Sequence, residues 1–344
     1  MGIKKLYNIL NDSCLVEEKE ISDFEYKIVA IDISIMLYKS IISVRNTGAD
    51  LVNNTGKITS HILGLFNNTI RLISYKILPV YVFDGKPPLM KSQELKDRKK
   101  NKTTAKETLD KIKLENEKVK KLYNNKKIDK DEFNRLSDEL EKSKIKYMKR
   151  NVHVDKDKYD DCKELLDLMG IPYIQAPEEA DSQCAYLSKM GYVDYVYTDD
   201  MDILTFGGLK IVKNLFKKKI NVINIKTIHE RLNINHDQFI ELCLLLGTDY
   251  NVGLLGSGKK IFKNYINTKK FDKDIIRNAD DVIEYFNHPK VNETKFKFKL
   301  KPCKLIELTT FLVSKHGLIQ YKIERKFKIL NTAYSMLNKN CVNI

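Results

Sequence analysis

The sequence predicts an α/β protein in which a mostly parallel central sheet is flanked by helices. Two observations lead to this prediction. Short apolar runs, of the kind that form buried strands, alternate with segments whose apolar residues recur at helical spacing. This alternation is typical of βαβ units, which bury a parallel sheet between layers of helices. One long charged segment, residues 91–150, interrupts the alternation and indicates a projection from the sheet.

Four apolar runs are the strand candidates, and they are residues 27–31, 78–83, 171–174 and 195–197. Three amphipathic segments lie around them, and they predict helices over residues 62–73, 165–169 and 239–246. We expect residues 1–90 and 151–250 to form the two halves of one sheet domain.

Residues 91–150 carry 21 Lys and Arg against 12 Asp and Glu, so more than half of the net charge lies in this segment. We predict two charged helices joined by a turn at Asn124 and Asn125, the second beginning with a capping box of Asp129 and Glu132. On charge alone, the better interpretation is a solvated coiled-coil hairpin without a chemical role.

Residues 251–344 are expected to form a helical, basic region. Its exception is the glycine-rich segment Gly253–Lys260, which predicts a tight hairpin that leads into a helix. Such a turn can offer backbone N–H groups to a phosphate, although the segment does not match a P-loop. The alternative is a simple connection between two helices.

Composition narrows the class of protein. The chain has 344 residues, 42% of them hydrophobic, and a formal net charge of +15, which indicates an anionic partner, with nucleic acid ahead of a membrane. No apolar run approaches the roughly 18 residues of a membrane span, and no secretory signal is recognisable. The six cysteines form no Cys-x-x-Cys pair, and the six histidines show no zinc spacing. We therefore expect an intracellular protein with free thiols, Cys162, Cys184 and Cys243 among the buried ones.

Acidic residues follow the predicted strands where those strands end. Because the carboxyl ends of parallel strands share one edge of a sheet, these side chains are expected to converge there. Carboxylates cannot gather unpaired at low cost, and oxygen-only ligands suit Mg²⁺ or Mn²⁺, two of which can clamp a phosphodiester during hydrolysis. A single such acid is usually a helix cap. Six of the seven candidates follow strands, Glu179 and Asp181 after a short loop, and the seventh ends the predicted helix over residues 239–246; they are Asp32, Asp84, Glu179, Asp181, Asp200, Asp202 and Asp249.

Several motifs, in order, make the chain resemble the flap endonucleases of the structure-specific 5′ nuclease superfamily, which includes the XPG and RAD types. The resemblance extends from residue 1 to about residue 265. The matching segments are Met1–Ile3, Val29–Ser34, Val80–Pro88, Leu168–Tyr173, Ala176–Asp181, Thr198–Asp202 and Leu244–Tyr250.

The resemblance implies a metal-dependent endonuclease and 5′–3′ exonuclease that acts on branched DNA and leaves a 5′-phosphate. It assigns the first metal ion to Asp32, Asp84, Glu179 and Asp181, and the second to Asp200, Asp202 and Asp249. Lys91 and Arg98 match residues that steer the scissile phosphate, at the base of a helical arch formed by residues 91–150. Tyr38 matches a residue that stacks on a base. The other DNA contacts that it implies are Gly2, Arg45, Arg71, Gly247, Gly256, Gly258, Lys259 and Lys260, with a K⁺ ion held near Gly253–Gly258.

The chain departs from the family pattern in several places. Asp181 stands where eukaryotic members have Glu, Asn68 replaces an arginine contact, Ser257 replaces an apolar residue, and the arch is longer. Residues 336–344 contain neither a sliding-clamp motif nor a basic tail, so clamp binding is not carried over.

We expect a monomer that removes 5′ flaps at sites of DNA replication, in a nucleus or a viral factory. Three alternatives stay open at this point. The chain could be a gap endonuclease, junction resolvase or exonuclease of the same superfamily, a DNA-binding clamp without catalysis, or an RNA nuclease.

Overall fold

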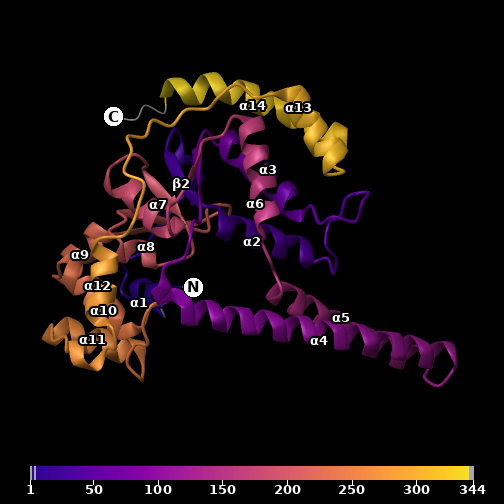
Figure 1. Cartoon of the computed structure of the whole chain (residues 1–344), viewed down its shortest axis with the longest axis horizontal. Coiled ribbons are helices and arrows are strands. Elements are labelled where there is room, and N and C mark those ends of the chain that lie inside the picture. The colour runs from indigo at the N-terminus through magenta and orange to yellow at the C-terminus, as the bar shows by residue number, and fades with distance from the viewer. Residues whose placement is uncertain (1, 4, 341–344) are drawn as a thin grey trace.

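The computed structural model describes residues 2–3 and 5–340, which form a seven-stranded sheet surrounded by helices (Figure 1). The strands lie in the order β1-β7-β6-β5-β2-β3-β4. The five strands from β4 to β6 run parallel, and β7 and β1 extend the sheet antiparallel. Their bounds are β1 (Glu17–Lys19), β2 (Ile28–Asp32), β3 (Leu78–Phe83), β4 (Tyr173–Gln175), β5 (Tyr195–Tyr197), β6 (Lys210–Lys213) and β7 (Ile220–Asn224).

The register of the central strands brings the ends of β2, β3 and β5 to one edge. Every residue of β2 and β3 is buried, as expected for apolar strands covered on both faces. Asp32 pairs with Val82 and Ile31 pairs with Tyr197. The residues that directly follow these strands therefore emerge side by side at the carboxyl edge of the sheet.

The helices that pack on the sheet begin and end with recognisable signals. Asp32 caps one of them, since its carboxylate accepts a hydrogen bond from the Ser34 amide at 2.8 Å. Gly170 ends another in the left-handed conformation, with φ of 72°. The helices around the sheet are α1 (Leu6–Asp12), α2 (Ile33–Arg45), α3 (Ser60–Ser74), α6 (Lys156–Met169), α7 (Ala180–Lys189) and α8 (Asp202–Thr205).

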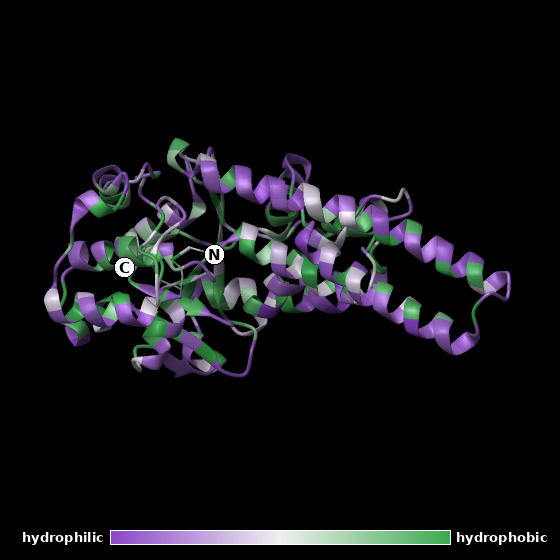
Figure 2. Ribbon diagram, turned by 90° about the horizontal axis from the view of Figure 1, so that it is seen from below, coloured by the Kyte–Doolittle hydropathy of each residue, from purple (hydrophilic) through white to green (hydrophobic). Residues whose placement is uncertain are grey.

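A long helical hairpin projects from the body of the molecule (Figure 1). It consists of α4 (Ser92–Asn124) and α5 (Lys130–Arg150), and Asp129 caps α5 by accepting from the Glu132 amide. At its tip the rings of Tyr123 and Phe133 stack with centroids 4.4 Å apart. Hydrophilic residues predominate along both helices (Figure 2), in keeping with a solvated projection.

The remaining helices gather at two places. One group lies at the end of the molecule next to α8, and the other lies over α3 and α6 (Figure 1). They are α9 (Ile225–Leu232), α10 (His236–Leu246), α11 (Gly258–Thr268) and α12 (Ala279–Asn287) in the first group, and α13 (Leu305–Thr310) and α14 (Gln320–Asn340) in the second. Short helical turns lie at Ile21–Phe24, Leu89–Lys91, Lys273–Ile275 and Phe311–Lys315.

The prediction of a mostly parallel sheet and of a charged hairpin is confirmed. Three strands were not anticipated, namely β1, β6 and β7, and β4 begins two residues later than expected. Cys162, Cys184 and Cys243 are buried free thiols, as expected, while Cys341 and Met1 lie outside the described residues. Among the helices that the structure describes, none is long and apolar enough to cross a membrane.

Candidate active site at the acidic edge of the sheet

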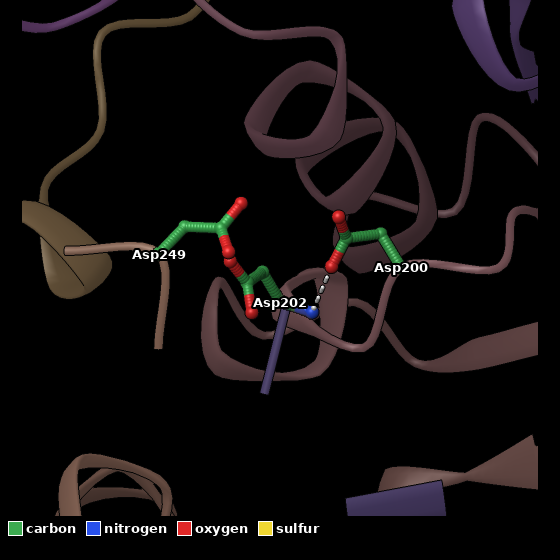
Figure 3. A group of neighbouring side chains, drawn as sticks. All are labelled: Asp200, Asp202 and Asp249. Atoms are coloured by element: carbon green, nitrogen blue, oxygen red, sulfur yellow. Dashed lines mark hydrogen bonds between the residues drawn. The ribbon is translucent and has the colours of Figure 1, made fainter. Parts of the chain in front are cut away.

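Three of the predicted acids form a tight cluster (Figure 3). Asp200 and Asp202 follow β5, and Asp249 lies in the loop after α10. One carboxylate oxygen from each lies within 4.8 Å of the others. The Asp200 carboxylate also accepts a hydrogen bond from the Asp202 amide at 3.1 Å, which fixes the tight turn between them. The cluster consists of the three acids that the resemblance assigned to the second ion.

The other four predicted acids lie beside this cluster. A cavity of about 520 Å³ is lined by Asp32, Asp84, Glu179 and Asp181 and also by Asp200. Asp84 follows β3, and its Oδ1 accepts from the Ala180 amide at 2.9 Å, so it caps the helix on which Asp181 lies. The edge of the sheet thus brings all seven candidates to one place.

Burial and mutual repulsion strongly perturb these carboxyl groups. Burial, with the nearby Asp84, raises the pKa of Asp32 well above its ordinary value. Burial and the charge of Asp200 do the same to the pKa of both Asp181 and Asp202. Groups with such raised pKa values are costly to ionise together without a compensating cation. The site is therefore suited to hold multivalent positive charge.

The donor set fits a divalent metal ion. Among the described residues, Asp181 Oδ1 and Asp202 Oδ1 are buried without a hydrogen-bond partner. Buried polar atoms almost always have a partner, so each of these oxygens is available to bind a metal ion. The site offers carboxylate oxygens, which hard cations such as Mg²⁺ and Mn²⁺ prefer.

Two cations at the base of the hairpin face the acids. Lys91 is only 7% exposed, and its Nζ lies 2.6 Å from Glu179 Oε1 and 3.6 Å from Asp249 Oδ2. Burial alone would lower the pKa of Lys91, but the charges of Glu179 and Asp181 raise it above its ordinary value. Arg98 donates to Asp249 Oδ2 at 2.9 Å and also pairs with Glu94. The structure thus brings both predicted phosphate-steering residues to the acidic edge.

Several partners of the acids were not found from the sequence. Ser34 donates to Asp84 Oδ2 at 2.6 Å, and the Tyr159 hydroxyl lies 2.7 Å from the same serine oxygen. The Tyr250 and Tyr285 hydroxyls both contact Glu179 Oε2. The positions of Tyr250, next to Asp249, and of Ser34, two residues after Asp32, were usable signals, whereas Tyr159 and Tyr285 adjoin none of the predicted acids.

Of the other predicted DNA contacts, Gly2 and Tyr38 lie at the site. Gly2 has φ of 70°, and a Cβ atom there would lie 1.9 Å from Asp200 Oδ1, so only glycine fits. Tyr38 lines the cavity, is 39% exposed, and donates to the Lys149 carbonyl at 3.3 Å. An exposed ring beside the acids is able to stack on a base.

The two predicted arginine contacts are not among the residues that line the cavity, and both have partners within the protein. The Arg45 guanidinium is buried, pairs with Asp50 at 2.8 Å, and donates to the Asn151 carbonyl at 3.0 Å. It therefore ties α2 to the end of α5. Arg71 donates to the Phe216 carbonyl at 2.9 Å and lies over the Phe216 ring. A DNA contact by either arginine stays a prediction.

The glycine-rich segment forms a turn ahead of α11, as expected. Gly253 packs against Gly247 so closely that a Cβ on Gly253 would lie 2.3 Å from the Gly247 amide nitrogen. Gly256 has φ of 127°, and Gly258 is the first residue of α11. Lys259 and Lys260 are exposed, and Lys259 pairs with Asp12 at 2.6 Å. Gly253 and Gly256 lie in the same connection between α10 and α11 as Asp249, and Lys259 and Lys260 lie in the first turn of α11.

The charge of the hairpin is concentrated next to the site. Residues 110–141, which include the tip, carry nine basic and nine acidic side chains. The whole surplus of positive charge on the hairpin therefore lies in residues 91–109 and 142–150, the two stretches closest to the sheet domain. An anionic strand would be attracted to the base of the hairpin rather than to its tip.

The sequence matches two family models, the XPG N-terminal domain over residues 1–105 and the XPG I-region over residues 170–249. Flap endonuclease 1 of Nematostella vectensis is 34% identical, with 97% of this chain and 88% of that protein covered. Flap endonuclease 1 of Homo sapiens is 37% identical, with 81% of this chain and 70% of that protein covered.

Solved structures with a similar fold include a flap endonuclease and the catalytic core of Rad2. Flap endonuclease-1 from Methanococcus jannaschii superimposes with a TM-score of 0.70 at 28% identity, with 99% of this chain and 100% of that chain covered. The catalytic core of Rad2, in complex with a DNA substrate, has a TM-score of 0.64 at 25% identity, with 96% and 99% covered.

Fold, acidic edge and these matches together define a structure-specific DNA endonuclease, a hydrolase of the XPG type. Within that class, the chain belongs to the flap endonuclease family.

Proposed function

We propose that the protein cleaves 5′ flaps and acts as a 5′–3′ exonuclease on branched DNA, with two Mg²⁺ ions and with Mn²⁺ as a substitute. One observation supports this most strongly. Seven carboxylates line one edge of the sheet, and two of their oxygens, on Asp181 and Asp202, are buried without partners in the described part of the chain. Flaps arise during replication and repair, so we place its action at sites of DNA replication, in a nucleus or a viral factory.

The acids divide into two groups by position. Asp32, Asp84, Glu179 and Asp181 would hold one ion, and Asp200, Asp202 and Asp249 the other. When bound, two such ions supply Lewis acidity and a lowered pKa for an attacking water, which leaves a 5′-phosphate on the product. The shorter side chain of Asp181, relative to glutamate, shifts one ligand by about one methylene and still offers an oxygen.

The cations of the hairpin bind and orient the substrate. Lys91 and Arg98 face the acidic edge from the start of α4, where they can draw the scissile phosphate toward the carboxylates. The exposed Tyr38 ring stacks on the base next to the cut. The positive surplus at the base of the hairpin guides the 5′ strand, which passes through an arch formed by residues 91–150.

The duplex is held by the connection between α10 and α11, which also carries Asp249, and by the start of α11. The turn at Gly253–Gly258 and the exposed Lys259 and Lys260 grip its phosphates, with Gly247 supporting the turn and Arg71 as a further contact. A K⁺ ion bound by backbone carbonyls of this turn would bridge to the phosphates. Flap affinity measured in K⁺ and in Na⁺ tests that ion. The protein acts as a monomer in this proposal, and no sliding clamp is required for cleavage.

The metal site is tested with Asp200→Ala. We expect no cleavage of a labelled 5′ flap, while flap affinity changes little because the basic residues that bind DNA are untouched. Asp199→Asn is the matched control, since Asp199 is adjacent, pairs with Lys39 at 2.6 Å, and is not an expected ligand. Cleavage by the Asp200→Ala protein, or by the wild type in EDTA, would refute the site.

The substrate class is tested by comparing a 5′ flap with a gapped duplex, a Holliday junction, a duplex end and an RNA hairpin. The wild type should prefer the flap, because passage through the arch needs a free 5′ end. Preference for the gap, the junction or the duplex end would favour a related nuclease of the superfamily. Binding without cleavage of any substrate would favour a DNA-binding clamp.

A further inference from the structure

Helix α12 reaches the acidic edge through one side chain that the proposed function leaves without a role. The Tyr285 hydroxyl lies 3.3 Å from Glu179 Oε2, and the Tyr250 hydroxyl contacts the same oxygen. An ionised carboxylate only accepts hydrogen bonds, so both tyrosines donate. Lys91 occupies the other oxygen, Oε1, at 2.6 Å. Glu179 is thus held from three sides by residues of three different segments.

These three contacts keep the Glu179 side chain from bonding the first turn of its own helix, α7. Glu179 is the N-cap residue of α7, a position from which a side-chain oxygen can accept a hydrogen bond from the free N–H groups of the first turn. In the described structure its side chain makes no such bond, and Asp84 accepts from the Ala180 amide instead. The tyrosine hydroxyls therefore fix a rotamer that faces the cavity and the other acids.

The chain after Tyr285 braces the same helix. Asn292 exchanges two hydrogen bonds with the fully buried Gln183 of α7, at 2.7 and 3.1 Å. Lys290 pairs with Glu178 at 3.3 Å. The Tyr285 ring itself packs against Phe206, with centroids 5.5 Å apart. Residues 285–292, at the end of α12 and just after it, therefore hold the start of α7 in place.

We propose that Tyr285 is a positioning residue that orients Glu179 for metal binding, and that it thereby links α12 to the acidic edge. This inference rests on the proposed function, in which Glu179 is a metal ligand. A carboxylate already held in its binding rotamer loses less freedom when it binds an ion. Removing partners that orient metal ligands typically costs 10- to 100-fold in metal affinity.

The test is Tyr285→Phe in the full-length chain, which removes the hydroxyl and keeps the ring. Tyr192→Phe is the matched control, because the Tyr192 ring also packs against a phenylalanine, Phe296, away from the acids. Mn²⁺ affinity is measured by electron paramagnetic resonance without DNA. We expect about 10-fold weaker Mn²⁺ binding for Tyr285→Phe and no change for the control.

Kinetics give a second readout. The Mg²⁺ concentration for half-maximal single-turnover cleavage should rise by about the same factor, while the rate at saturating Mg²⁺ returns to within about twofold of wild type and flap affinity is unchanged. In a Glu179→Gln background, Tyr285→Phe should have no further effect on Mn²⁺ binding.

Mn²⁺ affinity that is unchanged or tighter in Tyr285→Phe would overturn the inference, even if the wild type cleaves flaps normally. Absence of flap cleavage by the wild type at any Mg²⁺ concentration would instead defeat the proposed function. If Tyr285→Phe melts below the assay temperature, Tyr250→Phe carries the same test, because it removes the other hydroxyl from the same oxygen.

Discussion

Replacing Lys91 with methionine removes one charge from the centre of the acidic edge and keeps an unbranched apolar side chain. The ammonium group lies 2.6 Å from Glu179 and 3.6 Å from Asp249, and it is almost fully buried. Burial and these ion pairs hold the ammonium group at the acidic edge before a phosphate approaches. Loss of one such group typically costs about 100-fold in rate, or about 2.7 kcal/mol in the activation free energy.

We therefore expect Lys91→Met to slow single-turnover cleavage by about 100-fold at saturating Mg²⁺ and fixed salt. Flap affinity measured in Ca²⁺ should change by less than about threefold, because an interaction that acts mainly in the transition state contributes little to binding. Rapid-quench rates and fluorescence anisotropy give the two numbers.

Lys118→Met is the control for this experiment. Lys118 also lies on α4, is exposed, and pairs with Glu115 in the stretch of the hairpin that has no net charge. Its replacement should leave the cleavage rate unchanged. A rate for Lys91→Met within about threefold of wild type would remove the base of the hairpin from catalysis, and the hairpin would then be a solvated projection.

Three further predictions concern other parts of the molecule. Gly2→Ala should lower Mg²⁺-dependent cleavage by about 100-fold, because a Cβ 1.9 Å from Asp200 Oδ1 must displace that ligand; full activity would contradict the packing. Burial lowers the pKa of His61 to about 4, so the unfolded chain takes up its proton first as the pH falls. The free energy of unfolding should therefore drop by up to about 3 kcal/mol between pH 6.5 and 4, as measured by urea unfolding, and His61→Asn should remove that part of the pH dependence. Flap affinity should fall with a log–log salt slope of about −0.9 per phosphate contacted, and Lys260→Ala should make the slope shallower by about one; a flat salt response would mean that the positive charge does not contact DNA.

The central strands were predictable because they are buried on both faces. β2 and β3 are continuous apolar runs, and such runs are visible in the sequence. β1 consists of Glu-Glu-Lys at the edge of the sheet, with its side chains mostly exposed, so it carries no hydrophobic signal. β6 and β7 are short strands that mix apolar residues with Lys and Asn, and their pairing with neighbouring strands defines them.

The site was predictable to the extent that its residues follow strands. Asp32, Asp84 and Asp200 stand at strand ends, so topology alone brings them together. Contacts between distant segments were not predictable in this way. Tyr285 lies 106 residues from Glu179, and no local pattern marks it. Arg45 shows the converse case, because sequence similarity implied a DNA contact and the structure gives its side chain buried internal partners.

In the proposed function, the seven carboxylates at the sheet edge hold two metal ions on which cleavage depends. Anomalous diffraction from crystals of the protein with product DNA and Mn²⁺ tests it most directly. We expect two manganese peaks, about 4 Å apart, one beside Asp32, Asp84, Glu179 and Asp181 and the other beside Asp200, Asp202 and Asp249. No manganese peak at this edge, or peaks only at other carboxylates, would contradict it.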